Sequence, residues 1–433
     1  MGEYKFIHDT VHGSIRVDSF LLELMETPEL QRLSGIRQLG FSYLVFPGAN
    51  HTRLEHSLGT CHVAKQICRA LGIKDDEEKK VAAAALLHDV GHGPYSHTLE
   101  SLFHNMLGID HAELTKRIIT GDYDIVPHAD EKFFAARKTI PEILEKHGLK
   151  PEEVAALVTG GEDTNTIEMF GKKVRRGFSA KIIHSAIDAD QIDYLLRDSH
   201  YTGVAYGTID LDRLLQTLTV FRDQLVVHEK GISAVESILV ARALMYSSVY
   251  FHKTVRIAEL MLARAVETAV SRKKTDSEAI QKMTDSEITE YLLRSGTFER
   301  DIVLSLKYRS LFKRAFAKNV DELDDDQKTV LAGLADYRKR MKKERELCSR
   351  AGIPSGYAIV DLPAPELLLS EPRISKVDVK ILTDGGKLRN FSSQSPLSSA
   401  LKLRNTVKWV VMVSAHRKYR EKVRKAAEKV IFS

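Results

Sequence analysis

The sequence contains little cysteine, which limits the covalent and metal cross-links that it can form. Its three cysteines are Cys61, Cys68 and Cys348, and they do not have the paired spacing of a zinc site. Cys61 and Cys68 are expected at buried apolar positions of one helix. We therefore expect no disulfide, as is usual for a protein of the cytoplasm.

Long hydrophobic runs are missing as well. No stretch approaches the roughly 18 apolar residues that a membrane-spanning helix needs, and the polar start MGEYKFIHDT lacks the apolar core of a signal peptide. The sequence also has no internal repeat and no low-complexity segment. These absences predict a cytoplasmic protein without a membrane segment.

The chain has 433 residues, 43% hydrophobic and 28% charged, which suits an ordinary globular protein of two or three domains. Its net charge of +5 is unevenly spread, because the residues from Lys402 onward include ten Lys or Arg and two Glu. The stretch HRKYREKVRKAAEK reads as a basic terminal helix. This helix is either a solvated face or a binding face for a phosphate-rich partner, such as a nucleotide or a nucleic acid.

Hydrophobic periodicity predicts a mainly α-helical chain with a smaller α+β C-terminal region. A hairpin is expected over 4–17, and short strands are expected in QLVVHE, YAIVDL, VDVKIL and VKWVVMVSA. We expect three parts, over 1–270, 271–350 and 351–433. Helices are predicted at 27–39, 50–70, 76–90, 94–107, 111–120, 139–147, 151–158, 180–197, 210–219 and 233–270.

The stretch VAAAALLHDVGHGPYSHTLE carries the main chemical signal. Its apolar part, Val81–Leu87, suits a helix buried among other helices and carries His88 and Asp89 inward with it. Gly91 and Gly93 then allow the chain to turn. Taken alone, the His-Asp pair is either a capped helix end or a pair of ligands for a divalent metal ion, because buried charges need a partner.

Two other predicted helices supply further residues of the same kinds. His56 lies in the helix over 50–70, and Asp190 lies among apolar residues of the helix over 180–197. Acidic residues on an apolar helix face are rare and usually have a partner or a functional role. The sequence therefore predicts that one divalent ion, such as Mn, Fe, Zn, Ni or Mg, is held by His56, His88, Asp89 and Asp190.

Four blocks of the sequence resemble the HD-domain phosphohydrolases, and within them the deoxynucleoside triphosphate (dNTP) triphosphohydrolases. The resemblance runs over 4–260, through HDTVHGSIRVD, TPELQRLSGIRQLGFSYLVFPGANHTRLEHSLGT, LLHDVGHGPYSHTLE and IDADQIDYLLRDSHYTGV. It implies an HD-type helical catalytic domain over 1–270 and an α+β accessory region. The implied reaction is metal-dependent hydrolysis of a dNTP to a deoxynucleoside and triphosphate, with water attacking the α-phosphorus.

The resemblance also implies roles for residues around the metal. It places His92, His97 and Glu100 beside the metal as the reacting group, and it makes His111 a further active-site histidine. The family usually has Asp at the position of Glu100. Tyr194 and Tyr250 would pack on the sugar, or are core aromatics, and Asp198 would bind the sugar, pair with Arg197 or cap its helix. By the same resemblance, the sugar 3′-hydroxyl contacts would be Gln38 and Asp198, and the phosphate contacts would be Arg53, Arg242, Lys253 and His252. Gln191 stands where better-known relatives have a phosphate-binding Lys.

Some members of this family are tetramers switched on by a bound nucleotide. Glu26 and Gln31 align with that regulatory site, but Ser34 replaces an expected Arg. We expect a homo-oligomer, either a dimer or a tetramer, and leave a nucleotide activator open. The alternatives are a hydrolase of nucleoside monophosphates or another phosphoester, and a non-enzymatic nucleotide-sensing or nucleic-acid-binding protein.

Overall fold

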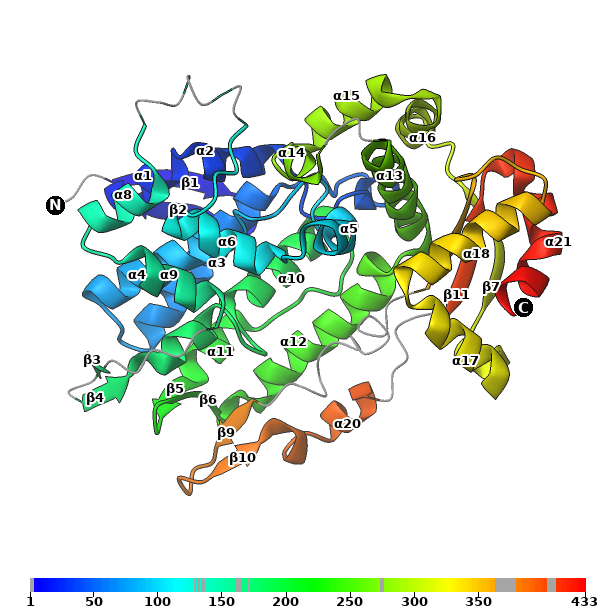
Figure 1. Ribbon diagram of the computed structural model, residues 1–433. Helices are drawn as coiled ribbons and strands as arrows, with labels where there is room; N and C mark the ends of the chain where they lie inside the picture. Colours follow the sequence, from blue (N-terminus) through cyan, green and yellow to red (C-terminus); the bar gives the residue numbers. More distant parts are fainter. Residues whose placement is uncertain are drawn as a thin grey trace. The chain divides into compact units, whose positions relative to one another are not determined.

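The computed structural model (Figure 1) describes residues 4–127, 130, 133, 137–160, 166–169, 172–272, 276–362, 379–402 and 410–433. The protein is mainly helical, with small sheets, and this confirms the predicted fold class. The first compact unit comprises Met1–Met245, Thr275–Ile288 and Ile374–Lys402, and the second comprises Tyr246–Lys274, Thr289–Arg373 and Leu403–Ser433. The two units interleave along the chain. The division over 1–270, 271–350 and 351–433 stays a prediction.

The first unit is organised around three packed helices. Helix α3 (Arg53–Ala70) packs against both α4 (Asp75–Leu87) and α10 (Ala189–Thr202). The apolar part of α4, Val81–Leu87, is buried at every position, because alanine and leucine side chains allow close packing on all sides. A capping box between Thr52 and Glu55 fixes the start of α3. These helices carry the predicted metal ligands.

The other elements of the first unit surround this helical core. The N-terminal hairpin was predicted correctly, and its strands β1 (Tyr4–Asp9) and β2 (Gly13–Asp18) are antiparallel. A four-stranded sheet has the order β10 (Leu388–Asn390), β9 (Lys380–Leu382), β6 (Gln224–His228), β5 (Leu218–Phe221). Strands β3 (Thr166–Met169) and β4 (Lys172–Arg175) pair with each other. The helices are α1 (Ser19–Met25), α2 (Pro28–Gln31), α5 (His97–Leu107), α6 (His111–Thr120), α8 (Ile140–Lys146), α9 (Pro151–Val158), α11 (Leu211–Thr217), α12 (Ile232–Met245), α14 (Ser277–Gln281) and α20 (Pro396–Lys402).

Two predicted helix bounds were wrong, the first because of a contact distant in sequence and the second because of a local cap. The helix predicted over 27–39 ends as α2 at Gln31, and a 3-10 turn leads to extended Ile36. The Ile36 carbonyl accepts a hydrogen bond from Arg53 N at 2.9 Å, so this segment pairs with the start of α3. The helix predicted from 180 begins instead at Ala189, because Asp188 accepts from Gln191 N and caps it.

The helices predicted over 210–219 and 233–270 also differ from the observed elements. Helix α11 ends at Thr217, and Leu218 starts β5. The long helix is broken at Tyr246–Tyr250, a π-helical turn, and α13 (Lys253–Ser271) follows it. The stretch Glu229–Tyr250 is long and apolar enough to cross a membrane, judged by length and composition alone. Core helices meet the same criterion, so the absence of a membrane segment stays a prediction.

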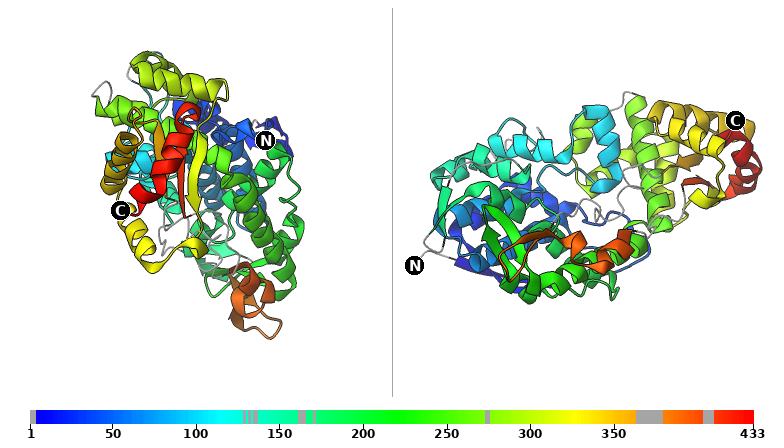
Figure 2. Two further views of the ribbon diagram at one scale, coloured as in Figure 1. Left: turned by 90° about the vertical axis from the view of Figure 1, so that its right-hand side faces the viewer. Right: turned by 90° about the horizontal axis from the view of Figure 1, so that it is seen from below.

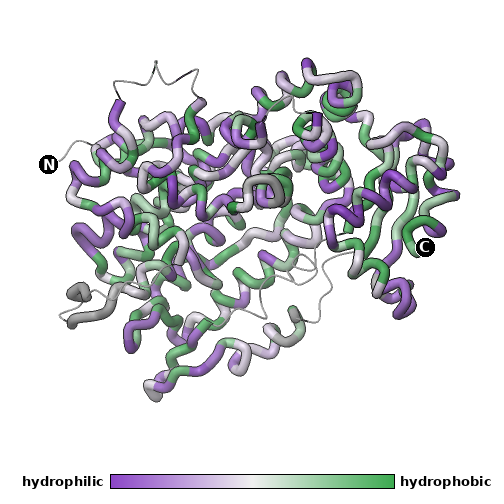
Figure 3. Tube along the Cα trace, viewed as in Figure 1, coloured by the Kyte–Doolittle hydropathy of each residue, from purple (hydrophilic) through white to green (hydrophobic). Residues whose placement is uncertain are grey.

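The second unit is built on a three-stranded antiparallel sheet in the order β7 (Lys313–Lys318), β11 (Val411–Ala415), β8 (Ala358–Asp361). Helices α18 (Tyr337–Arg350) and α21 (Arg420–Ile431) pack against its apolar residues. Figure 2 (left) shows α21 lying along this sheet, and in Figure 3 the strands are mostly hydrophobic while α18 is mostly hydrophilic. The strands predicted in YAIVDL and VKWVVMVSA are thereby confirmed. The other helices are α16 (Thr297–Lys307) and α17 (Asp325–Leu334), and α15 (Asp285–Ser295) straddles the unit boundary.

A buried carboxyl group in α18 predicts a pH-dependent stability. Glu344 accepts hydrogen bonds from Val360 N and Arg264 Nη2, and burial raises its pKa to about 7 against the opposing charge of Arg264. The folded state therefore binds more protons than the unfolded state, whose pKa is 4.5, and stability is lost as the pH rises through 7. The wild type loses this stability between pH 5 and pH 8, whereas Glu344→Gln does not. The free energy of unfolding of Glu344→Gln should therefore rise by about 2 to 3 kcal/mol relative to the wild type over this range.

Urea unfolding of both proteins at the two pH values measures this gain. The control is Glu346→Gln, which changes an exposed glutamate of the same helix. Its difference from the wild type in free energy of unfolding should be the same at both pH values. A Glu344→Gln difference that is also constant would contradict the prediction.

Candidate metal centre

The four predicted metal ligands meet in the first unit. His56 on α3 places its Nε2 2.9 Å from Asp190 Oδ1 and 3.7 Å from Asp89 Oδ2. His88, which caps the C-terminus of α4, places its Nε2 3.4 Å from Asp89 Oδ1 and 3.7 Å from Asp190 Oδ1. Ligand atoms that share one ion at about 2.1 Å lie roughly 3 to 4 Å apart. Ligand atoms of His56, His88 and Asp190 all lie within 4.8 Å of one another, so these three residues fit one ion, and Asp89 lies beside them.

Hydrogen bonds orient both histidines so that Nε2 faces the cluster. His56 Nδ1 lies 2.7 Å from Asp193 Oδ2, and His88 Nδ1 lies 2.8 Å from the carbonyl of Ala85. In each case Nδ1–H donates outward, which leaves the Nε2 lone pair for a metal. His88 Nε2 is buried and makes no hydrogen bond to any residue that the structure describes. A buried ring nitrogen of this kind fits a coordinated ion.

The charges of the cluster also fit a cation. Burial opposes protonation of His56, but hydrogen bonds to Asp190 and Asp193 outweigh it and raise the pKa of His56 to about 10. The pKa of His88 is raised as well, because Asp89 and Asp190 outweigh its burial. The carboxylates thus attract positive charge into a buried space. A divalent ion bound at neutral pH would take the place of these protons.

Arg53, in the first turn of α3, borders the metal cluster. Its Nη1 donates to Asp89 Oδ2, and its Nε donates to Ser96 Oγ at 2.7 Å. Ser96 has a φ of +53° and caps α5, and its hydroxyl donates to the Arg37 carbonyl at 2.6 Å. Arg53 Nη2 is buried and has no hydrogen-bond partner among the described residues. This arrangement leaves one guanidinium donor for an anion beside the metal.

Three histidines and a glutamate form a second cluster next to Asp89. His92 Nε2 lies 3.4 Å from Asp89 Oδ1, and its ring stacks on that of His111 with centroids 4.2 Å apart. Glu100 Oε1 is hydrogen-bonded to His111 Nδ1, and Glu100 Oε2 lies 2.7 Å from His97 Nδ1. The structure therefore brings together the four residues predicted as catalytic, and their roles stay predictions.

The pKa values of His92 and His111 shift in opposite directions. Burial lowers the pKa of His92, and the positive charges of Arg53 and His111 lower it further. Burial acts in the same direction on His111, but the Glu100 hydrogen bond outweighs it and raises the pKa of His111. Contacts with His111 and His97 hold the pKa of Glu100 well below its usual value despite burial. These surroundings thus favour the neutral form of His92 and the protonated form of His111.

Two predicted sugar contacts lie around His51. Gln38 N donates to the His51 carbonyl at 3.0 Å, and His51 Nε2 lies 2.8 Å from Asp198 Oδ1. Asp198 therefore interacts with His51. Arg197, which was suggested as an alternative partner of Asp198, binds Asp193 instead. Gln38 Oε1 is buried and accepts no hydrogen bond from any described residue.

The remaining predicted substrate contacts are not all in the same unit. Tyr194 is half-buried on α10. Arg242 is buried on α12, and its Nη1 donates to Gln191 Oε1 at 2.8 Å. Tyr250 and Lys253 belong to the second unit. Their proposed contact with a substrate at this centre stays a prediction.

No sequence pattern assigned a site role to Asp193, which holds the ring of His56 through its Nδ1. Its carboxylate lies 2.7 Å from both His56 Nδ1 and His12 Nε2, and it accepts from Arg197 Nε at 2.9 Å. Arg197 Nη1 also donates to Asp9. Gly59 leaves room for this carboxylate, because a Cβ there would lie 1.9 Å from Asp193 Oδ1. The available signal was an acidic residue on an apolar helix face.

We expect Asp193→Asn to weaken metal binding by about 10- to 100-fold, because an amide is a poorer acceptor for His56 Nδ1–H. Titration of metal-free protein with Mn²⁺ in a calorimeter measures the change. The control is Asp212→Asn, which alters an exposed aspartate of α11. Equal affinity in both variants would show that Asp193 does not support the ligand.

Comparisons with known proteins agree with this centre. The HD domain family matches residues 53–198, and the HD associated region matches residues 209–432. The uncharacterized protein MJ1154 of Methanocaldococcus jannaschii is 33% identical over 428 residues, covering 98% of this chain and 81% of that protein. A hypothetical protein from Aquifex aeolicus has a similar structure, with a TM-score of 0.68 and 28% identity over 98% of this chain and 100% of that one.

A relative with a named activity is more distant. The deoxynucleoside triphosphate triphosphohydrolase SAMHD1 of Gallus gallus is 29% identical over 382 residues, which cover 79% of this chain and 61% of that protein. This chain therefore spans less than two thirds of that relative. Taken together, the two family matches and the His and Asp cluster show that the chain belongs to the HD-domain phosphohydrolases, which are metal-dependent, and that it carries an HD associated region.

Proposed function

We propose that this protein hydrolyses dNTPs to a deoxynucleoside and triphosphate, using one divalent metal ion. The observation that supports this most directly is the buried Nη2 of Arg53, which has no partner among the described residues and borders Asp89. A guanidinium donor beside a metal site suits a phosphate oxygen. The similarity to SAMHD1, whose name states this activity, supports a dNTP as the substrate.

In the proposed reaction, water attacks the α-phosphorus. The new P–O bond forms as the bond from phosphorus to O5′ breaks, so triphosphate and the deoxynucleoside leave. A divalent ion held by His56, His88, Asp89 and Asp190 would offset the phosphate charge and polarise the α-phosphoryl group. Arg53 would hold a phosphate oxygen in place.

Two protons must move in this reaction. The attacking water loses one proton, and O5′ gains one. Neutral His92 suits the acceptor, and protonated His111, balanced by Glu100, suits the donor. His97 has 64% of its side chain exposed, so the cluster can exchange protons with solvent.

The sugar side of the substrate would meet Gln38 and Asp198. The buried Oε1 of Gln38 can accept a hydrogen bond from a 3′-hydroxyl, and Asp198 is held by His51. This pairing supports recognition of a nucleoside rather than of a bare phosphate. Tyr194 would pack against the ring of the sugar.

The test is a product analysis with the metal-loaded protein. Each dNTP, singly and in mixtures, is incubated with Mn²⁺ in water enriched in oxygen-18, and the products are separated by chromatography. We expect a deoxynucleoside and triphosphate, with the heavy oxygen in the triphosphate. Stepwise release of orthophosphate, or no deoxynucleoside, would refute the proposal.

A second candidate is hydrolysis of nucleoside monophosphates, and Gln191 favours it. Its Nε2 donates to the Ser185 carbonyl at 2.9 Å, and its Oε1 accepts from Arg242. Gln191 brings no positive charge to this position, which supports a substrate with fewer phosphates than a triphosphate. The same assay with deoxynucleoside monophosphates decides between them, because this candidate predicts orthophosphate as the released anion.

Assembly into a homo-oligomer and activation by a nucleotide are further proposals. At the expected regulatory site, Gln31 Nε2 donates to the Met25 carbonyl, and Ser34 Oγ donates to the Gln31 carbonyl, each at 2.7 Å. Light scattering after gel filtration, with and without added nucleotides, measures the assembly state. A dimer or tetramer is expected, and a monomer under all conditions would refute the proposed assembly.

A further inference from the structure

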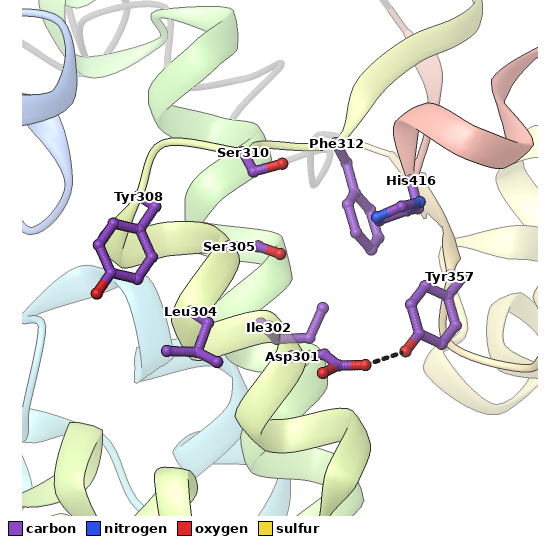
Figure 4. A pocket seen from close by; sticks show the side chains of 9 residues that line it. All are labelled: Asp301, Ile302, Leu304, Ser305, Tyr308, Ser310, Phe312, Tyr357 and His416. Atoms are coloured by element: carbon purple, nitrogen blue, oxygen red, sulfur yellow. Dashed lines mark hydrogen bonds between the residues drawn. The ribbon is translucent and has the colours of Figure 1, made fainter.

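The second unit contains a cavity for which the proposed hydrolysis has no use (Figure 4). Its volume is about 330 Å³, near the lower limit for pockets that hold one small ligand. The cavity lies where α16, the loop before β7 and the neighbouring ends of β8 and β11 meet. Its polar and aromatic lining comprises Asp301, Ser305, Tyr308, Phe312, Tyr357 and His416.

Aromatic rings form two sides of this cavity. Figure 4 shows Tyr308 on one side and Phe312, Tyr357 and His416 on the other. The His416 ring meets those of Phe312 and Tyr357 edge-on, with centroids 5.9 and 5.7 Å apart. Tyr308 is 71% exposed, so its ring is accessible to a ligand. A planar ring is the ligand that such walls suit best.

Asp301 gives the cavity a polar end. Its Oδ2 accepts a hydrogen bond from the Tyr357 hydroxyl at 3.0 Å. A carboxylate at this place can accept hydrogen bonds from the N–H groups at the edge of a nucleobase. It would also repel a phosphate, so the phosphates of a bound nucleotide would lie outside the cavity.

Basic residues adjoin the cavity lining in sequence. Lys307, Arg309, Lys313 and Arg417 each adjoin a lining residue in sequence, and Lys418 follows Arg417. All five side chains are exposed. The Lys307 Nζ lies 5.5 Å from the centroid of the Tyr308 ring. Positive charge therefore adjoins the aromatic walls.

The positive charge continues beyond the cavity. From Arg417 to Ser433 the chain has seven Lys or Arg and two Glu, and α21 within it is about 18 Å long. Glu421 accepts from Arg424, and Glu428 pairs with Lys318, so the acidic residues offset only part of this charge. The adjacent α18 adds seven Lys or Arg and two Glu, of which Glu344 is buried. One nucleotide is too short to neutralise such a surface.

We propose that this face of the second unit binds single-stranded nucleic acid. One base enters the cavity between Tyr308 and the rings opposite, and its N–H groups donate to Asp301. The sugar–phosphate backbone follows the basic residues of α21 and α18. A single strand is required because the bases of a duplex are already stacked and paired.

The experiment measures binding of the intact full-length protein to a labelled single strand of about 12 nucleotides by fluorescence anisotropy. We expect saturable binding that weakens steeply with salt and is much weaker for the matching duplex. Tyr308→Ala should weaken binding by about 10-fold, because it removes one stacking surface. Replacing Arg417 and Lys418 with Ala should lower the salt slope by about 1 to 2.

Matched variants of the first unit control for general effects. Tyr206→Ala removes another partly exposed tyrosine, and the double change of Lys79 and Lys150 to Ala removes two exposed lysines. Both controls should bind like the wild type. The variant Asp190→Asn should also bind the strand normally, which separates this site from the metal centre.

Three results would overturn the proposal. Equal binding of duplex and single strand would indicate general polyanion binding, and an unchanged Tyr308→Ala affinity would exclude the cavity. A free mononucleotide that displaces the strand at equal molar concentration would identify a site for single nucleotides instead. A Tyr308→Ala loss accompanied by wild-type circular dichroism and hydrolysis would support the proposal.

Discussion

Replacing Asp190 with Asn is expected to lower the hydrolysis rate by at least about 1000-fold and to abolish tight metal binding. Asp190 Oδ1 lies within 2.9 Å of His56 Nε2 and 3.7 Å of His88 Nε2, so it joins the two histidines around one space. An amide at this place removes one negative charge and presents a poorer metal ligand. Loss of a metal's electrostatic effect costs several kcal/mol of transition-state stabilisation.

Two measurements separate the metal effect from misfolding. Elemental analysis after purification without added metal should find less metal in Asp190→Asn than in the wild type, and circular dichroism should be unchanged. Asp212→Asn, an exposed carboxylate on α11, is the matched control and should retain metal and activity. Full metal content in Asp190→Asn would mean that Asp190 is not a ligand.

Replacing Arg53 with Lys is expected to lower kcat by about 100- to 1000-fold while leaving the metal in place. Arg53 uses Nη1 for Asp89 and Nε for Ser96, which fixes the guanidinium, and the third nitrogen, Nη2, is buried without a partner among the described residues. A lysine keeps the charge but cannot make this fork of hydrogen bonds. Removal of one well-placed donor to a developing oxyanion has an effect of this size.

The lysine variant is preferred to alanine because Asp89 is buried and would lose its counter-charge, at a cost of about 3 to 5 kcal/mol in stability. Steady-state kinetics with the best substrate and metal analysis of the same sample give the two readouts. Arg213→Lys, at an exposed position of α11, is the control. A small effect on kcat with a large effect on KM would show that Arg53 only holds the ground state.

The convergence of the metal ligands could be predicted because their signals are local. The apolar run of α4 places His88 and Asp89 at depth, and Asp190 is conspicuous on the apolar face of α10. The family resemblance supplied the proposed roles of His92, His97, Glu100 and His111. Hydropathy also located most helices of the first unit, since each has its own periodic pattern.

The partners of these residues could not be predicted in the same way. His56 and Asp193 are 137 residues apart in sequence, and His12 and Asp193 are 181 apart, so no local pattern joins them. The extended segment at Ile36 also depends on a distant partner, Arg53. The π-helical turn at Tyr246–Tyr250 interrupts an apolar pattern that reads as one continuous helix. Such features arise from tertiary packing rather than from local preference.

The bond between His12 and Asp193 has a consequence for the order of events during synthesis. The β1–β2 hairpin leaves the ribosome before α10, because the α10 partner of His12 is made 181 residues later. At about 5 to 20 residues per second, the hairpin waits roughly 10 to 40 s for that partner. The nascent chain therefore cannot complete its metal pocket until α10 has emerged, and a ribosome stalled earlier would carry a chain unable to load the ion.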